Sequence, residues 1–183
     1  MPELVDYVVE LRRYFAGNDA KPLRELSNRL IKEAVLQDNK TIAKIAVLAY
    51  CLHKILSKEH FLKASYWPRA RADFLFAIDE LIHILRTDGK REVQQTINKL
   101  IRMLDNVDKN FGRYVQNLWD KGKAKLASSA YALGMSLQKA TELTGADLRS
   151  VQLYIGSTLI HEEEPTTESL REKLEKLRKM VKD

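Results

Sequence analysis

The residue types at positions 149 to 152 suit contact with the bases and phosphates of a nucleic acid. Arg149 carries a planar guanidinium group, Ser150 a hydroxyl and Gln152 an amide. Such groups hydrogen bond to base edges and phosphate oxygens where proteins contact DNA. Three cationic side chains that suit phosphates come earlier in the chain, at Lys121, Lys123 and Lys125. We therefore predict these six residues as a nucleic-acid-binding set.

Residue patterns typical of catalysis or metal binding are incomplete in this chain. Glu80-x-x-His83 has the spacing of a carboxylate-bridged di-metal site, but such a site needs a second Glu-x-x-His, which the sequence lacks. Cys51 lies in an apolar run and is expected to be a small buried side chain. No Gly-Lys pair follows the glycine spacing of a phosphate-binding loop. We predict no catalytic residue, no metal and no cofactor, and so a protein that is not an enzyme.

An enzymatic alternative stays open as a pocket near His53, His60 and Trp67. The same region offers an aromatic pair that ends at Trp67 and is followed by Arg69 and Arg71. Arginines beside aromatic rings suit phosphate contact and base stacking. We favour the alternative interpretation, in which Trp67 fills the core and the arginines cover the surface.

The candidate contact residues are predicted to lie on the second of two short helices within residues 136–157. Gly145 stands where the first helix must end, because glycine enters the left-handed backbone conformation at no steric cost. Asp147 stands where its side chain can cap the second helix. Small and apolar side chains are spaced to pack across the turn, at Ala140, Leu143, Thr144, Val151 and Tyr154.

The run from Ala140 to Ile155 resembles the helix-turn-helix superfamily of DNA-binding modules. Thr141 takes the place usually held by alanine, and Ala146 the place usually held by valine. The resemblance covers roughly residues 125–158. It implies that the second helix is a recognition helix, that the partner is duplex DNA, and that the role is transcription regulation.

Two leucines on the same predicted helix favour a different class of function. Leu148 and Leu153 stand close to the positions that would face a groove, and an exposed leucine pair is more typical of a protein contact. We predict a non-enzymatic nucleic-acid-binding or regulatory protein, with a helical protein–protein interaction or scaffold protein as the alternative. Burial of the leucines would exclude both uses of this helix. Flanking lysines would favour DNA, and an apolar surround would favour protein.

Helical periodicity through the rest of the chain predicts an all-α multi-helix bundle. Apolar residues recur at intervals of three and four, and the alternating pattern of strands is missing. Pro68 predicts a break near Trp67. The helix at 40–57 is apolar on nearly every side, which predicts a central position. The helices expected before the module span 3–15, 22–36, 40–57, 69–86, 90–108 and about 109–133.

We divide the chain into a helical body (1–133), a helix-turn-helix-like module packed on it (134–160), a linker (161–166) and a C-terminal amphipathic helix (167–183). The amphipathic helix has a narrow apolar seam of coiled-coil type, made by Leu170, Leu174, Leu177 and Val181. So short a helix is marginal in water by itself. We expect it to dock on its own domain, on a protein partner, or on a second copy in a homodimer.

Composition sets the remaining bounds. The chain has 183 residues and a net charge of +6, and residues 1–133 hold the basic excess. A moderate positive charge permits an acidic partner without requiring one. A single cysteine rules out an intramolecular disulfide, and neither a leader nor an apolar run of membrane-spanning length is evident. We expect a cytoplasmic protein that does not associate with membranes.

Overall fold

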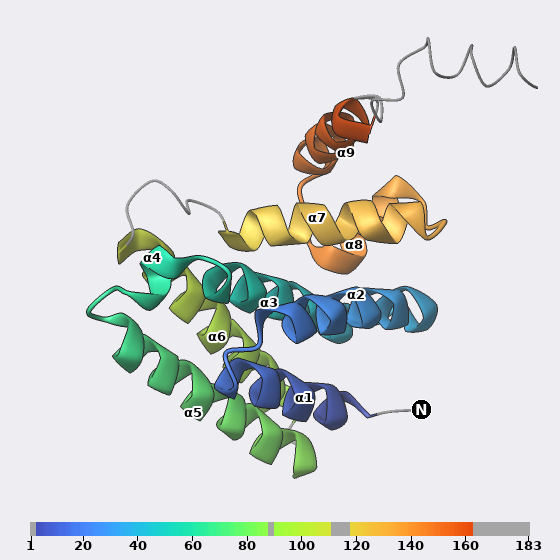
Figure 1. Ribbon diagram of the computed structural model, residues 1–183. Coiled ribbons are helices and arrows are strands. Elements are labelled where there is room, and N and C mark those ends of the chain that lie inside the picture. The colour runs from blue at the N-terminus through green and yellow to red at the C-terminus, as the bar shows by residue number, and fades with distance from the viewer. Residues whose placement is uncertain (1–2, 88–89, 111–117, 163–183) are drawn as a thin grey trace, which may run out of the picture.

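The computed structural model describes residues 3–87, 90–110 and 118–162, and within them the chain is helical, with no strand (Figure 1). The predicted all-α class is therefore confirmed. The helices are α1 (Leu4–Ala16), α2 (Ala20–Gln37), α3 (Lys40–Leu56), α4 (Glu59–Leu62), α5 (Trp67–Arg86), α6 (Lys90–Asn110), α7 (Leu118–Ala132), α8 (Leu137–Thr144) and α9 (Leu148–Glu162).

Most helix positions agree with the periodicity of the sequence. The break near Trp67 is confirmed, because α5 begins at that residue with Pro68 in its first turn. The expected helix at 109–133 differs at its start, since residues 109 and 110 continue α6 and α7 is described only from Leu118. Helix α9 runs through Glu162 and so takes up the first two residues of the expected linker.

Helix α3 lies at the centre of the fold (Figure 1). It packs against α2 along its length, with α7 and α8 on one side and α1 and α6 on the other. Helices α5 and α6 form a hairpin below it, and α9 is the outermost helix above α7. Eleven of the seventeen residues of α3 are buried. An apolar surface on every side explains this position, because each face needs a covering helix.

Gly122 allows α7 to approach α3 closely. A Cβ atom built at this glycine would lie 3.1 Å from Val47 Cγ1, 3.2 Å from Cys51 Sγ and 3.3 Å from Tyr50 Cδ1. These distances are tighter than ordinary van der Waals contact, so a side chain here would push α7 away from α3. Because α9 packs on α7, this contact also sets the position of α9 relative to the body.

The connection between α8 and α9 follows the turn chemistry that the sequence predicts. Gly145 has φ +68°, in the left-handed region, and its N–H donates to the Thr141 carbonyl. Asp147 Oδ2 then accepts from the Ser150 N–H at 2.9 Å and from the Ser150 hydroxyl at 3.0 Å. At the other end of α8, Ser136 Oγ accepts from the Lys139 N–H at 3.3 Å. Gly145, Asp147 and Ser150 therefore turn the chain and begin α9 with a defined first turn.

Replacing Gly122 with valine should destabilise the fold. The added side chain overpacks the α3–α7 contact, a defect that typically costs about 1–3 kcal/mol. At this chain length the melting temperature should fall by several degrees, which thermal unfolding measures. Gly156→Ala is the matched control, because nothing lies within 4 Å of its added Cβ and alanine stabilises a helix by about 0.5–1 kcal/mol relative to glycine. Equal stability of Gly122→Val and the native chain would contradict the close approach.

Replacing Asp147 with alanine should loosen the first turn of α9. The Ser150 N–H loses its acceptor, and an uncapped helix N-terminus frays. We expect faster amide hydrogen exchange at Ser150 in this variant. Asp147→Asn keeps an acceptor oxygen at the same place and should remain close to the native rate. A native rate of exchange at Ser150 in the alanine variant would show that Asp147 does not hold the turn.

Candidate functional site

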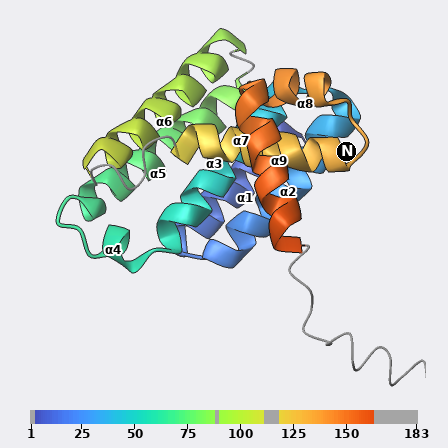
Figure 2. The same cartoon turned by 90° about the horizontal axis from the view of Figure 1, so that it is seen from above.

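Helix α9 is anchored on one side and open on the other. Val151 is fully buried and joins the same core as Ala140 and Leu143 of α8. Tyr154 and Ile155 pack partly buried against that core. Viewed from above, α9 crosses over α7 as the uppermost helix (Figure 2). One side of α9 therefore holds the helix in place while the opposite side faces solvent.

The open side of α9 forms a shallow hollow on the surface. It is lined by Arg149, Gln152, Leu153, Gly156 and Ser157. Their spacing of three and four residues places them on one face of the helix. Leu153 is 67% exposed and Leu148, at the start of the helix, is 47% exposed. The leucines are thus not packed inside the fold, so the burial that would exclude recognition through this helix is not found.

The exposed face of α9 carries positive charge and no carboxylate between residues 148 and 157. Arg149 and Gln152 are exposed on it. The Ser150 hydroxyl donates to the Asp147 carboxylate at 3.0 Å, which uses this side chain in the cap. The Ser150 N–H and hydroxyl hold the pKa of Asp147 below its ordinary value, because both hydrogen bonds favour the charged carboxylate. Of the three predicted base contacts, two lie on the open face and the third supports the turn.

The three predicted phosphate-binding lysines of α7 have different surroundings. Lys121 is exposed. Lys123 lies 2.8 Å from Asp120 in an ion pair, and its side chain is only 20% exposed. Lys125 reaches α9, with its Nζ 5.7 Å from the centre of the Tyr154 ring. The fold therefore places Lys125 next to α9. The ammonium group of Lys123 is instead engaged in an ion pair with Asp120.

Basic and aromatic side chains from the body meet α9 near Lys125. We call this set the basic–aromatic cluster; it consists of Arg24, Tyr50, His53, Lys54, Lys125 and Tyr154. Lys54 Nζ lies 5.5 Å from the centre of the Tyr50 ring, and the Tyr50 and His53 rings are 6.3 Å apart. Arg24 interacts electrostatically with Tyr50, His53 and Tyr154. Four helices, α2, α3, α7 and α9, contribute to the cluster.

The pKa values of Tyr50 and His53 in the cluster are shifted mainly by burial, and nearby positive charges also act on them. Burial and the neighbouring Tyr154 raise the pKa of Tyr50 to about 12. Burial lowers the pKa of His53, and the charges of Lys54 and Arg24 lower it further. The His53 Nδ1 lies 2.8 Å from the Ala20 carbonyl oxygen and donates to it, a contact that opposes the lowering. His53 is thus a packed imidazole in a cationic environment.

The sequence pattern did not point to Arg24, Tyr50 or Lys54. These residues lie on α2 and α3, and no local motif links them to α9. A lysine and a tyrosine four residues apart, such as Tyr50 and Lys54, are common on the half-exposed face of a helix. This pair therefore does not indicate a binding site. Only the crossing of α9 over the body places them beside Tyr154.

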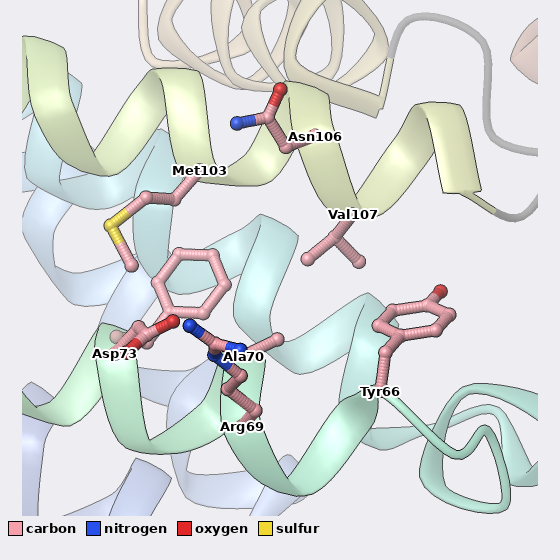
Figure 3. Close-up of a pocket in the computed structure, with 8 residues that line it drawn as sticks. Tyr66, Arg69, Ala70, Asp73, Met103, Asn106 and Val107 are labelled. Atoms are coloured by element: carbon pink, nitrogen blue, oxygen red, sulfur yellow. The ribbon is translucent and has the colours of Figure 1, made fainter.

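A separate cavity of about 220 Å³ lies between α5 and α6 (Figure 3). Arg69 and Asp73 reach it from α5, and Met103 and Asn106 from α6. Its remaining lining residues are Tyr66, Ala70, Phe74 and Val107. The polar side chains of this lining are those of Tyr66, Arg69, Asp73 and Asn106, and no cysteine, serine, threonine, lysine or histidine is among the lining residues.

The other singled-out residues take structural positions. Trp67 is buried and meets Phe15 edge-on, with ring centres 6.3 Å apart. Arg71 donates to the Ala16 carbonyl at the end of α1, at 2.6 Å. Glu80 pairs with Lys99 at 2.7 Å, and His83 is exposed. Trp67 therefore fills the core, as one of the two interpretations of its pattern predicts.

The described part of the chain contains no group of three or more His, Cys, Asp or Glu side chains that could hold a metal ion. Nor does any helix within it have the length and apolar character needed to cross a bilayer. The apolar seam at Leu170, Leu174, Leu177 and Val181 lies outside the described residues.

Two surfaces thus stand out in the described residues, the open face of α9 and the basic–aromatic cluster beside it. They adjoin at Tyr154 and Lys125. No known family model, curated protein or solved structure matches this chain, so the arrangement of its own residues carries the functional argument.

Proposed function

We propose that this protein is a non-enzymatic nucleic-acid-binding regulatory protein. In this proposal α8, the turn and α9 act as a helix-turn-helix-like module, and α9 contacts duplex DNA. The carrying observation is the open face of α9, which presents Arg149 and Gln152 to solvent with no carboxylate between residues 148 and 157.

The dimensions and chemistry of an α-helix support this proposal. The major groove of B-DNA is about 12 Å wide and admits one helix. An arginine suits the O6 and N7 acceptors of guanine, and a glutamine suits the N6 and N7 groups of adenine. Gly156 adds no side chain to the same face, so the backbone of α9 can approach a groove closely. Lys121 and Lys125 on α7 would then contact phosphates next to the groove.

A second candidate function is protein recognition, and the surroundings of Leu153 favour it. Leu153 is largely exposed, and Gly156 leaves space beside it within the hollow. An apolar side chain of a partner protein would fit between them. Leu148 and the seam from Leu170 to Val181 are further candidates for such contacts, either with another protein or with a second copy of this chain.

Duplex DNA binding should weaken steeply as salt is added. Each phosphate contact contributes about −0.9 to the slope of log affinity against log salt. Lys121→Gln should lower affinity for every duplex sequence and reduce this slope. Arg149→Gln and Gln152→Ala should in addition change the preference among sequences, by about 1–3 kcal/mol at a contacted base pair. Fluorescence anisotropy with a panel of duplexes at several salt concentrations measures both quantities.

Absence of duplex binding at low salt would overturn the first proposal and leave protein recognition as the better candidate. Lys63→Gln serves as the matched control for charge, because Lys63 is exposed, pairs with Glu59 and follows α4, a helix that lies away from α9 (Figure 2). An equal loss of binding in Lys63→Gln and Lys121→Gln would mean that net charge, rather than the face next to α9, sets the affinity.

Truncation after Glu164 should reduce either thermal stability or self-association. The seam at Leu170, Leu174, Leu177 and Val181 needs an apolar partner surface, since a helix of this length is marginal alone. A homodimer through this seam would suit a helix-turn-helix protein, because two-fold symmetry matches paired half-sites. Sedimentation and thermal unfolding of the truncated chain distinguish the two effects. If both match the full-length chain, the seam serves neither the fold nor a homodimer.

A further inference from the structure

The basic–aromatic cluster lies beside α9, where the phosphate backbone of a bound duplex would pass. A helix with its side chains is about 10–12 Å across and nearly fills the major groove. The two phosphate strands that border the groove must therefore pass along the flanks of the helix. Tyr154, which is partly buried against the core, lies on the flank where the anchored side of α9 begins, next to Lys125 of α7.

The cluster continues from that flank onto the body of the protein. Tyr154 interacts electrostatically with Tyr50 of α3, and Arg24 of α2 interacts with both tyrosines. Lys54 lies over the Tyr50 ring at 5.5 Å. In the view from above, α9 crosses α7 with α2 and α3 beneath it (Figure 2). Cationic groups are thus arranged in sequence from the flank of α9 to α3.

The aromatic rings help to hold these cations in place. A lysine ammonium above a tyrosine ring is attracted by the negative face of the ring, and this occurs for Lys54 with Tyr50 and for Lys125 with Tyr154. Holding a long side chain in one position before binding lowers the entropy lost when it contacts a ligand. The cluster is therefore better organised for an anion than separate surface lysines are.

The charged groups that shift the pKa values of Tyr50, His53 and Tyr154 are cationic. His53 is influenced by Lys54 and Arg24, and Tyr154 by Arg24. The other groups that act on Tyr50 are Tyr154 and the thiol of Cys51, which are neutral in their ordinary protonation states. No carboxylate is among the groups that shift these three residues.

We propose that the basic–aromatic cluster binds the phosphodiester backbone that borders the groove occupied by α9, with Arg24, Lys54 and Lys125 as the phosphate contacts. This inference rests on the proposed function and names residues of the body, on α2 and α3, as part of the same interface. It also assigns Arg24 and Lys54 the role that the sequence assigned to Lys123, whose ammonium pairs with Asp120.

Neutral substitutions at Arg24 and Lys54 test this inference with a DNA duplex as the probe. Arg24→Gln and Lys54→Gln should each lower affinity roughly three- to tenfold near physiological salt, and each should reduce the salt slope by about 0.9. Neither should change the ranking of duplex sequences, because phosphate contacts carry no base information. Arg24→Lys and Lys54→Arg should restore most of the affinity, which a loss of fold would not allow.

Arg86→Gln is the matched control, since Arg86 is exposed at the end of α5, on the side of the molecule away from α9 (Figure 1). If Arg24→Gln and Lys54→Gln behave like this control while Arg149→Gln alters sequence preference, the cluster inference is overturned and the role of α9 stands. If the cluster variants lose affinity and Arg149→Gln does not, the cluster is supported and the role of α9 is overturned. No duplex binding by the native chain overturns both.

The imidazole of His53 provides a second, independent measurement. Burial and the neighbouring charges of Lys54 and Arg24 lower its pKa in the free protein. A phosphate bound next to these groups would favour the protonated ring, so duplex binding should raise the pKa of His53 in an NMR titration. The imidazole signals of His83, exposed on α5, serve as the reference. An unchanged His53 titration in the duplex-bound protein would contradict phosphate binding at the cluster.

Discussion

The fold depends on the need to cover α3 on all sides. Eleven of its seventeen residues are buried, and nearly all of them are apolar. Each square ångström of apolar surface removed from water contributes about 25 cal/mol, so helix α3 is stable only when neighbouring helices surround it. Helices α1, α2, α6, α7 and α8 all pack against it. The surface that each of them presents to solvent is set by the face that it must turn toward α3.

This constraint also explains why the candidate interface lies where it does. Helix α7 can cover α3 only at the close distance that Gly122 permits, and α8 covers the neighbouring part of α3. Helix α9 then has α7 and α8 as its principal support, so it becomes the outer layer of the molecule. The same packing of α9 on α7 and α8 leaves one face of α9 open and places Tyr154 of α9 near Tyr50 of α3. The proposed interface therefore does not need a separate domain, because the packing order of the helices produces it.

Local chemistry made part of this arrangement predictable from the sequence. Gly145 and Asp147 act within a few residues of themselves, so the end of α8 and the start of α9 could be located without knowledge of the rest of the fold. Pro68 likewise marks the start of α5. The end of α6 was predicted too early, at 108, because residues 109 and 110 belong to α6 and polar residues there fit the end of one helix as well as the start of another.

Interactions between distant segments were beyond what one sequence can show. The pairing of Lys123 with Asp120 was within reach, since the two residues are three apart on one helix. The meeting of Arg24, Tyr50 and Tyr154 was not, because helical periodicity shows which face of a helix is buried and leaves its partner helix unknown. The sequence thus identified α9 as the helix that carries the candidate site. The basic–aromatic cluster next to α9 became evident only from the packing of the helices.

The two exposed leucines of α9 weigh less for protein recognition than their presence in the sequence suggests. At 3.6 residues per turn, Leu148 and Leu153 point about 140° apart around the helix, so they do not form one apolar stripe. A helix that docks in a groove of another protein presents apolar anchors three, four and seven residues apart, and only Leu153 occupies the open face with Arg149 and Gln152. Single exposed leucines are common on protein surfaces. A lone leucine between polar groups also suits the major groove, where apolar side chains contact the methyl group of thymine. The composition of the open face therefore favours a nucleic acid over a protein groove as its partner.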